Sequence, residues 1–185
     1  MTRPPLALGV SASPSQESRS KQLLAAVLEH WARAGLEIRR VDLDRLEADA
    51  LLGRAPNEDL TQALGWIGSA GVLAIATPVY RATYSGLLKV FFDLLPYGAL
   101  AGKIVVPIAT GGSAAHQLAL DHGLRPLVAS LGGVTVSTGV YATPEQFAEG
   151  RAEPLLLARV ERAAEEALEL ALSAPSSPPT LATHA

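Results

Sequence analysis

Cysteine is absent from the 185 residues, and aromatic residues make up only 5% of them. A chain without cysteine has no disulfide, no thiolate nucleophile and no cysteine-ligated metal. Long apolar runs are also missing, because the longest are only strand-sized, so we expect no membrane-spanning segment. The formal net charge is −3 and no stripe of Lys and Arg is present, which argues against a nucleic-acid partner. We expect no signal peptide and a cytoplasmic protein.

The length fits one domain, since a chain of this size buries about two thirds of the surface that its unfolded form exposes. No linker divides the sequence, and we expect residues 1–172 to form a single domain. Residues 173–185 are rich in Pro, Ser, Ala and Thr and lack the apolar content to pack. This composition predicts a flexible C-terminal tail.

Strand-like and helix-like segments alternate along the chain. Continuous apolar runs predict strands covered on both faces, and one alternating segment predicts a strand near the sheet edge. The apolar runs cover residues 6–11, 71–76 and 103–109, and the alternating segment covers residues 36–42. Residues 134–140 are expected to supply the last strand. A closing helix is expected over residues 154–172, with apolar residues at Leu155, Leu156, Ala163, Ala167 and Leu168. The order predicts an α/β fold, a doubly wound parallel sheet of about five strands with helices on both faces.

Residues 77–89 join the central strand to a helix. Pro78 removes a backbone donor and is predicted to end the strand, so that residues 79–84 form a loop with two tyrosines at the carboxyl edge of the sheet. Ser85 can then cap a helix over residues 86–95. That helix is apolar almost all round, which predicts burial on two sides. One side is expected to be another subunit, in a homodimer or homotetramer.

The loop after the first strand is dense in hydroxyl groups. It runs from Ser13 to Ser20 and contains Arg19. We expect Ser20 to be the N-cap of a helix that ends at Gly35. Hydroxyls, free amides and an arginine at a helix N-terminus are the donors that a phosphate needs. An ordinary solvated loop is the alternative. Neither a P-loop nor a dinucleotide fingerprint is present, and in residues 43–61 we find no chemistry.

Two glycines follow the strand of residues 103–109. Gly111 and Gly112 would let backbone N–H groups approach a flat ligand closely, although an ordinary turn is the alternative. The carboxyl edge of the sheet is therefore predicted to carry three ligand loops from three strands.

The helix predicted over residues 113–131 has a slipped apolar face. Leu124 and Leu127 lie on one apolar face. When the same helical spacing is continued toward the N-terminus, Asp121 falls on that face and the apolar residues Leu118 and Ala119 do not. Pro126 breaks the hydrogen-bond ladder at the same place. A one-residue π-bulge near residues 121–123 would return Leu118 and Ala119 to the core, and a plain proline kink is the alternative.

These motifs resemble the flavodoxin-like NADPH-dependent FMN reductases, and more narrowly the sulfonate-assimilation type that supplies reduced flavin to a partner monooxygenase. The resemblance runs from residue 6 to about residue 140 and rests on Ser13-Pro14, Ser18-Arg19-Ser20, Ala76 to Tyr80, Tyr84-Ser85-Gly86 with Lys89, Ala109 to Gly112, His116 and Pro126. It implies that the FMN phosphate is held by Ser13, Ser18, Arg19 and Ser20. It implies that the isoalloxazine is bordered by Pro78, Val79, Tyr80, Thr110, Gly111 and Gly112. NADPH or NADH is the implied hydride donor. Some relatives carry a π-helix, often with a tyrosine where this chain has His122.

Hydride transfer from a nicotinamide to FMN needs no acid or base from the protein, since the cofactor carries the chemistry. We therefore expect no catalytic side chain, and no metal site, because His116 and His122 do not share a helical face. One alternative is a quinone, azo-dye or chromate reductase with firmly bound FMN. Another is a non-enzymatic electron carrier, which the small net charge and the apolar helix fit less well.

Overall fold

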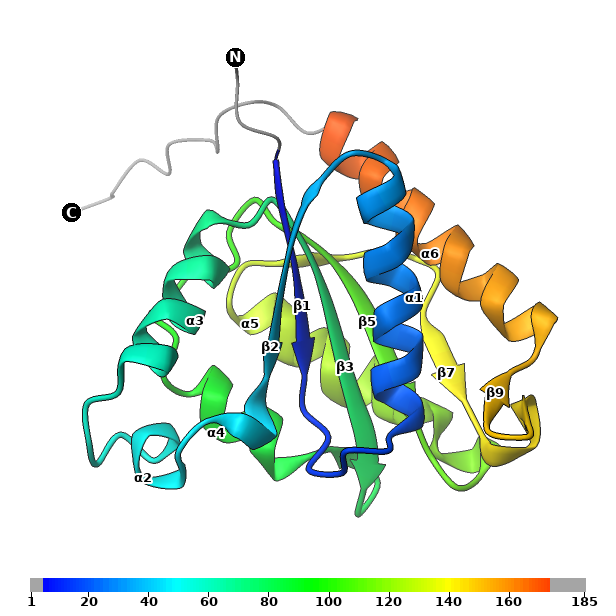
Figure 1. Cartoon of the computed structure of the whole chain (residues 1–185), viewed down its shortest axis with the longest axis horizontal. Helices are drawn as coiled ribbons and strands as arrows, with labels where there is room; N and C mark the ends of the chain where they lie inside the picture. The colour runs from blue at the N-terminus through cyan, green and yellow to red at the C-terminus, as the bar shows by residue number, and fades with distance from the viewer. Residues whose placement is uncertain (1–4, 174–185) are drawn as a thin grey trace.

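The computed structural model describes residues 5–173. A sheet lies between two layers of helices (Figure 1). The strands are β1 (Leu6–Ser11), β2 (Glu37–Asp42), β3 (Val72–Tyr80), β4 (Thr83–Tyr84), β5 (Ile104–Thr110), β6 (Val134–Thr135), β7 (Val140–Ala142), β8 (Phe147–Ala148) and β9 (Arg151–Ala152). The α-helices are α1 (Arg19–Arg33), α2 (Ala48–Leu51), α3 (Glu58–Ser69), α4 (Gly86–Phe92), α5 (Arg125–Ser130) and α6 (Pro154–Ser173).

The central strands are parallel, in the order β2-β1-β3-β5-β6, as the alternation of strands and helices predicts. The sheet has seven strands, where about five were predicted. One extra strand is β4, which pairs antiparallel with the end of β3. The other arises because the predicted strand 134–140 is split: β6 pairs with the start of β5, and β7 pairs with its end.

Side chains form hydrogen bonds with the backbone between β6 and β7. Arg125 Nη1 donates to the carbonyl oxygen of Val136 at 2.6 Å. The carboxylate of Glu166 accepts hydrogen bonds from the backbone amides of Ser137 (2.6 Å) and Thr138 (2.9 Å). Backbone groups that would otherwise extend the ladder are therefore bonded to side chains, and a continuous strand does not form.

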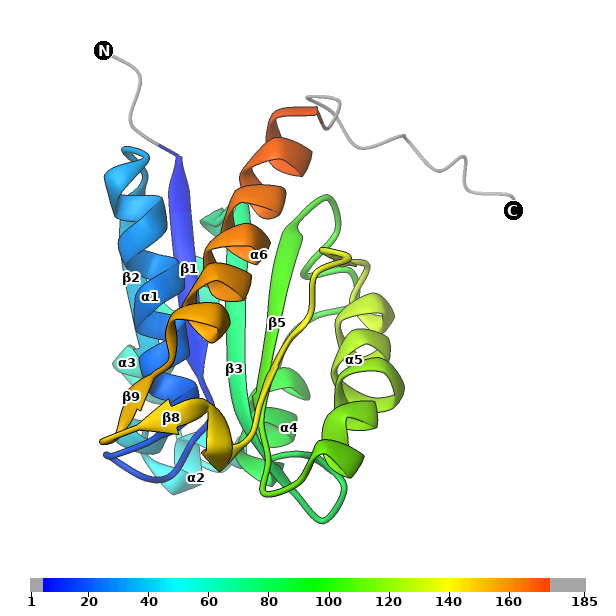
Figure 2. The same cartoon turned by 90° about the vertical axis from the view of Figure 1, so that its right-hand side faces the viewer.

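Both faces of the sheet are buried, which confirms the doubly wound arrangement. Figure 2 shows α1 and α6 on one side of the strands and α4 and α5 on the other. Alternate residues of one strand face opposite layers: Leu73 and Ile75 pack with α3, α4 and α5, whereas Ala74 and Ala76 pack with α1 and α6.

The N-cap of α1 is Ser18, two residues before the predicted Ser20. Ser20 lies inside the helix and is buried, with its hydroxyl 2.9 Å from that of Ser18. Gly35, at a φ of +88°, follows the last turn as predicted.

Pro78 does not end its strand, contrary to the prediction, and β3 continues to Tyr80. The pairing of β3 with β1 stops at Ala76, whereas its pairing with β5 includes Pro78 and Thr110. Pro78 therefore has a neighbouring strand on one side only, where a missing N–H is tolerated. The predicted loop 79–84 is a hairpin made by β3 and β4.

The apolar helix after Ser85 is shorter than predicted, because α4 ends at Phe92. The side chains of Leu88, Phe91 and Phe92 are buried in the core of the same chain, so their apolar character needs no second subunit. Only half-buried residues remain for an outer contact, namely Leu87, Val90 and Leu94.

The predicted helix 113–131 consists of three pieces. A 3-10 turn (Ala114–Gln117) is followed by a π-helix over Leu120–Leu124 and then by α5. The π-bulge prediction is confirmed, and Ala119 is buried as expected. Leu118, however, is 61% exposed. It follows a 3-10 turn, so the α-helical period does not extend back to it.

Helix α6 covers the predicted residues and continues to Ser173. Its inward face includes Leu156, Val160, Ala163 and Ala167, whereas Leu155 is 86% exposed. Apart from Ser173, the predicted flexible tail falls outside the described residues. In residues 5–173, no helix combines the length and the apolar character that crossing a membrane requires.

Candidate functional site

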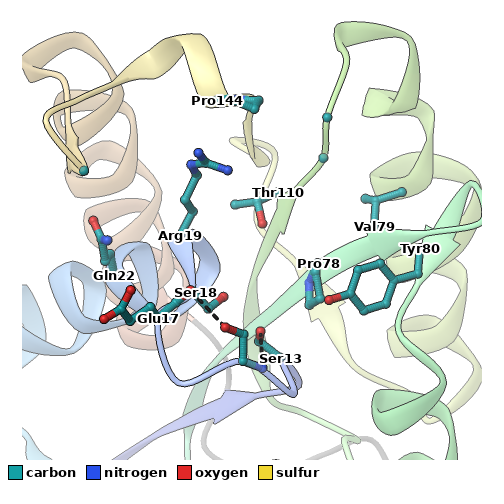
Figure 3. A pocket seen from close by; sticks show the side chains of 14 residues that line it. Ser13, Glu17, Ser18, Arg19, Gln22, Pro78, Val79, Tyr80, Thr110 and Pro144 are labelled. Atoms are coloured by element: carbon teal, nitrogen blue, oxygen red, sulfur yellow. Dashed lines mark hydrogen bonds between the residues drawn. The ribbon is translucent and has the colours of Figure 1, made fainter.

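A cavity of about 470 Å³ opens at the carboxyl edge of the sheet (Figure 3). Its volume is in the range of small-molecule and cofactor sites. Nine of the ten predicted site residues line it: Ser13, Ser18, Arg19, Pro78, Val79, Tyr80, Thr110, Gly111 and Gly112. The tenth, Ser20, is buried behind Ser18. The loops after β1, β3 and β5 therefore meet at one place.

The first wall is the loop after β1 and the N-terminus of α1. The amide of Ser15 donates to the hydroxyl of Ser13 (3.3 Å), which bends the loop beneath the helix. The first helical hydrogen bond runs from Gln22 to Ser18, and the Ser18 hydroxyl does not cap the helix. The amides of residues 19–21 thus have no partner within the helix. With no acidic residue in the first turn, this end of α1 suits an anion.

The charge at this wall comes from Arg19. Its side chain is exposed and points along the cavity wall (Figure 3), with Cζ 5.5 Å from the centre of the Phe147 ring. Lys21 is close in sequence but is buried and paired with Asp44, so its charge is directed away from the cavity. Glu17 also lines the cavity and reduces the local positive charge.

Buried hydroxyls fix the second wall, at the end of β3. The backbone amide of Ser85 donates to Thr77 Oγ1 (2.9 Å), and the Ser85 hydroxyl donates to the carbonyl of Ala12 (2.7 Å). The same Ser85 oxygen accepts the amide of Leu88 (3.2 Å), so it caps α4 as predicted. One serine therefore ties together the strand end, the helix start and the loop after β1.

The hairpin after Pro78 carries Tyr80, which lines the cavity and is 49% exposed. Its turn is formed by Arg81 and Ala82, both at positive φ (52° and 68°). The hairpin rests on the π-helix, because a Cβ at Gly123 would lie 2.8 Å from Thr83 Oγ1. A side chain at position 123 would therefore push the hairpin and shift the cavity wall.

The third wall follows β5, where the two glycines have different roles. A Cβ at Gly111 would collide with the hydroxyl of Tyr141, which donates to the carbonyl of Ser113 (2.6 Å). Burial raises the pKa of Tyr141, so this donor keeps its proton at neutral pH. A Cβ at Gly112 would meet nothing within 4 Å, and its φ is not positive. Protein packing requires Gly111, whereas Gly112 leaves open space toward the cavity.

Sequence reasoning missed a fourth wall. Pro144 and Gly150, which flank β8 in the chain, line the cavity and form this wall. Ser15, Glu17 and Gln22, which were not predicted, also line the cavity on the side of α1. The turn of the hairpin β8–β9 has Glu149 (φ 49°) and Gly150 (φ 77°) at its tip. The only sequence signal is this Glu-Gly pair, since strands of two residues show no periodicity.

These walls fit a flat ligand with a phosphate. Free amides and serine hydroxyls converge at the α1 end, and a slot lies between the loops after β3 and β5. In the described residues no group of three or more His, Cys, Asp or Glu could hold a metal ion.

Comparisons with known proteins agree with this geometry. The family model described as NADPH-dependent FMN reductase matches residues 5–148. An FMN reductase (NADPH) of Pseudomonas putida is 36% identical over 167 residues, which is 89% of this chain and 85% of the relative. A solved structure of an apo NADH:FMN oxidoreductase is 38% identical, with a TM-score of 0.82 over 94% of this chain and 91% of the other. A Streptococcus flavodoxin, 18% identical, has a TM-score of 0.60 over 89% of this chain and 99% of its own, which shows that the fold is flavodoxin-like.

The matched region contains the loops after β1, β3 and β5 and all ten predicted site residues, and it ends at β8. The chain belongs to the NADPH-dependent FMN reductase family.

Proposed function

We propose that this protein is an NAD(P)H-dependent FMN reductase, which transfers a hydride from a reduced nicotinamide to FMN. The observation that carries the proposal is the cavity where uncapped amides of α1 face a slot between two strand-end loops. Family membership supports it. A cytoplasmic location is part of the proposal, because the reaction consumes a reduced nicotinamide that metabolism supplies inside the cell.

The residues of this chain bind and orient. Ser13, Ser18, Arg19 and the first-turn amides of α1 would hold the phosphate, and Ser20 would act from behind Ser18. Residues 78–80 and 110–112 would border the ring system. FMN, when bound, supplies the ring that accepts the hydride, so no protein acid or base is required.

The cavity is open, and this favours a flavin that exchanges. Tyr80 is half exposed at its rim, and the adjacent residue Arg81 is exposed. An exchangeable flavin suits an enzyme that supplies reduced FMN to a partner monooxygenase. We include that partner in the proposal, with either NADPH or NADH as donor.

The test is a steady-state assay with NADPH and NADH as donors and with FMN, riboflavin and a benzoquinone as acceptors. We expect saturable oxidation of the nicotinamide that depends on added FMN. Turnover of the quinone at a higher kcat/KM, with FMN bound firmly through purification, would contradict the proposal and favour a quinone reductase.

We also propose a homo-oligomer that uses the outer side of α4. The half-buried residues Leu87 and Val90 belong to α4, the half-buried Leu94 follows its end, and Tyr97 is 98% exposed. Light scattering should report a dimer or tetramer at micromolar concentration, and Tyr97→Asp should weaken it. Leu155→Asp, at an exposed leucine of α6, is the control. A monomeric wild type would contradict this assembly.

A further inference from the structure

The ring of Phe147 connects the core to the rim of the cavity. It is half buried, and it packs against the apolar cluster between the sheet and helices α1 and α6. Arg19 Cζ lies 5.5 Å from the centre of the ring, within the range of a cation–π contact. The ring therefore contacts both the core and an exposed cation.

The backbone around Phe147 is fixed by hydrogen bonds. Phe147 pairs with Ala152 in the hairpin β8–β9, and the amide of Glu153 donates to the carbonyl of Gln146 (2.9 Å). The side-chain oxygen of Gln146 accepts the amide of Thr143 (3.1 Å), which closes the turn before β8. The ring is consequently held at a defined place, in the segment between Pro144 and Gly150, which line the cavity.

Arg19 has little else to orient it. Among residues 5–173, the ring of Phe147 lies against its guanidinium, and Glu145 interacts with it electrostatically. Glu145 is a nearby carboxylate: its pKa is lowered first by the hydroxyl of Thr143 and by its own backbone amide, and in smaller part by the positive charge of Arg19. A long exposed arginine loses much rotamer freedom when it binds a ligand. A ring that holds the guanidinium by its face reduces that loss and leaves the N–H edge free to donate.

We propose that Phe147 is a positioning residue that holds Arg19 toward the cavity, so that the hairpin β8–β9 determines how tightly a phosphate-bearing flavin is retained. The inference rests on the proposed function, since the ligand is FMN. It concerns binding of the phosphate only, and we expect substitution of Phe147 to leave binding of the flavin ring system unchanged.

The experiment compares FMN with riboflavin, which has the same ring system and no phosphate. Phe147→Leu removes the π-face and keeps an apolar side chain for the core, and Phe147→Tyr keeps the ring. The matched control is Trp66→Leu, because Arg39 lies over the Trp66 ring (5.9 Å) far from the cavity residues. Affinities are measured by flavin fluorescence titration, and folding is checked by thermal denaturation.

We expect Phe147→Leu to weaken FMN binding about three- to fivefold, which corresponds to about 0.6–1 kcal/mol. Riboflavin affinity should be unchanged, and Phe147→Tyr and Trp66→Leu should behave like the wild type. In an Arg19→Ala background, Phe147→Leu should have no further effect on FMN.

Three results would overturn the inference alone: an unchanged FMN affinity in Phe147→Leu, an equal loss for FMN and riboflavin, or a full effect that persists without Arg19. Failure of the wild-type protein to bind FMN would overturn the proposed function and this inference with it.

Discussion

Lys21 Nζ lies 2.8 Å from Asp44 Oδ1, and both side chains are buried. The other carboxylate oxygen of Asp44 accepts a hydrogen bond from Gln16 Nε2, also at 2.8 Å. Asp44 thus holds the loop after β1 at one point and the first turn of α1 at another. The segment 43–61, in which the sequence showed no chemistry, provides the anchor of the phosphate wall.

Asp44→Asn should destabilise the fold, because it leaves the ammonium of Lys21 buried without its nearest carboxylate. We expect a loss of about 3 kcal/mol, the low end for a broken buried pair, since Asp42 remains 4.0 Å from Lys21. Urea unfolding followed by tryptophan fluorescence measures it. Asp49→Asn, in the exposed pair with Arg54 at 3.9 Å, is the control and should cost less than about 0.5 kcal/mol. Equal stabilities of the two variants would refute the anchoring role.

Arg19→Ala should weaken FMN binding without unfolding the protein, because it removes a charged donor from an exposed helix start. The expected cost is about 1.5–3 kcal/mol in binding free energy, and little change is expected for riboflavin. Fluorescence titration of both flavins checks it. An unchanged FMN affinity would remove Arg19 from the phosphate site.

Alanine substitutions at the two glycines should separate packing from binding. Gly111→Ala should cost about 1–3 kcal/mol of stability, because its Cβ displaces the Tyr141 hydroxyl. Gly112→Ala should stay within about 0.5 kcal/mol of the wild type, because the new Cβ meets no protein atom, and should bind FMN more weakly. Thermal unfolding and flavin titration test the pair. A stable Gly112→Ala protein with wild-type FMN affinity would argue against a ligand at this loop.

Glu166 should make stability depend on acid pH. Burial acts to raise its pKa, but hydrogen bonds from the Thr138 hydroxyl and from the amides of Thr138 and Ser137 outweigh it and lower the pKa to about 2 from a usual 4.5. The folded protein then binds this proton more weakly than the unfolded chain does. The stability that Glu166 adds is complete above about pH 4.5 and is lost as pH falls toward about 2.

The corresponding experiment compares the wild type with Glu166→Gln. At pH 7 the variant should be about 1–2 kcal/mol less stable, a figure that allows for partial solvent exposure, and the difference should shrink at pH 3. Glu161→Gln, at an exposed carboxylate of the same helix, is the control. A difference between wild type and Glu166→Gln that stays constant with pH would contradict this account.

Deleting His122 should convert the π-helix into a regular α-helix and leave the protein folded. His122 is exposed, and after the deletion the buried Leu120 and Leu124 are three positions apart, still on one helical face. The contact between Gly123 and the hairpin should shift, so FMN retention or oligomeric state should change.

Circular dichroism and FMN titration test the deletion of His122. Deletion of Ala129, from the regular helix α5, is the matched control and should be more disruptive, because it rotates the residues on one side by about 100°. Loss of secondary structure on deleting His122 would instead indicate a kinked helix in continuous register.

From the sequence alone, the order of the main strands and helices and three of the four cavity walls could be predicted. Strands such as β3 and β5 are long apolar runs, and the chemistry of their ends is local: Ser13 and Arg19 lie next to the start of α1, and Gly111 and Gly112 follow β5 directly. Because parallel strands share a carboxyl edge, those loops had to meet. The shift of the apolar face around His122 could also be predicted, because a single inserted residue changes the helical spacing of the apolar residues.

Other features depend on contacts between residues that are far apart in the sequence, and they could be seen only in the tertiary structure. Asp44 is separated from Lys21 by 23 residues, and its role comes from an ion pair that no local pattern encodes. The hairpin β8–β9 has strands too short for periodicity, and it forms the fourth wall only because Phe147 packs into the core beside α1 and α6. Phe91 and Phe92 could equally have faced a partner subunit, and they are buried in their own chain because the sheet needs a covering layer on that face. Local propensity sets which elements form, and the burial of apolar surface sets which of them meet.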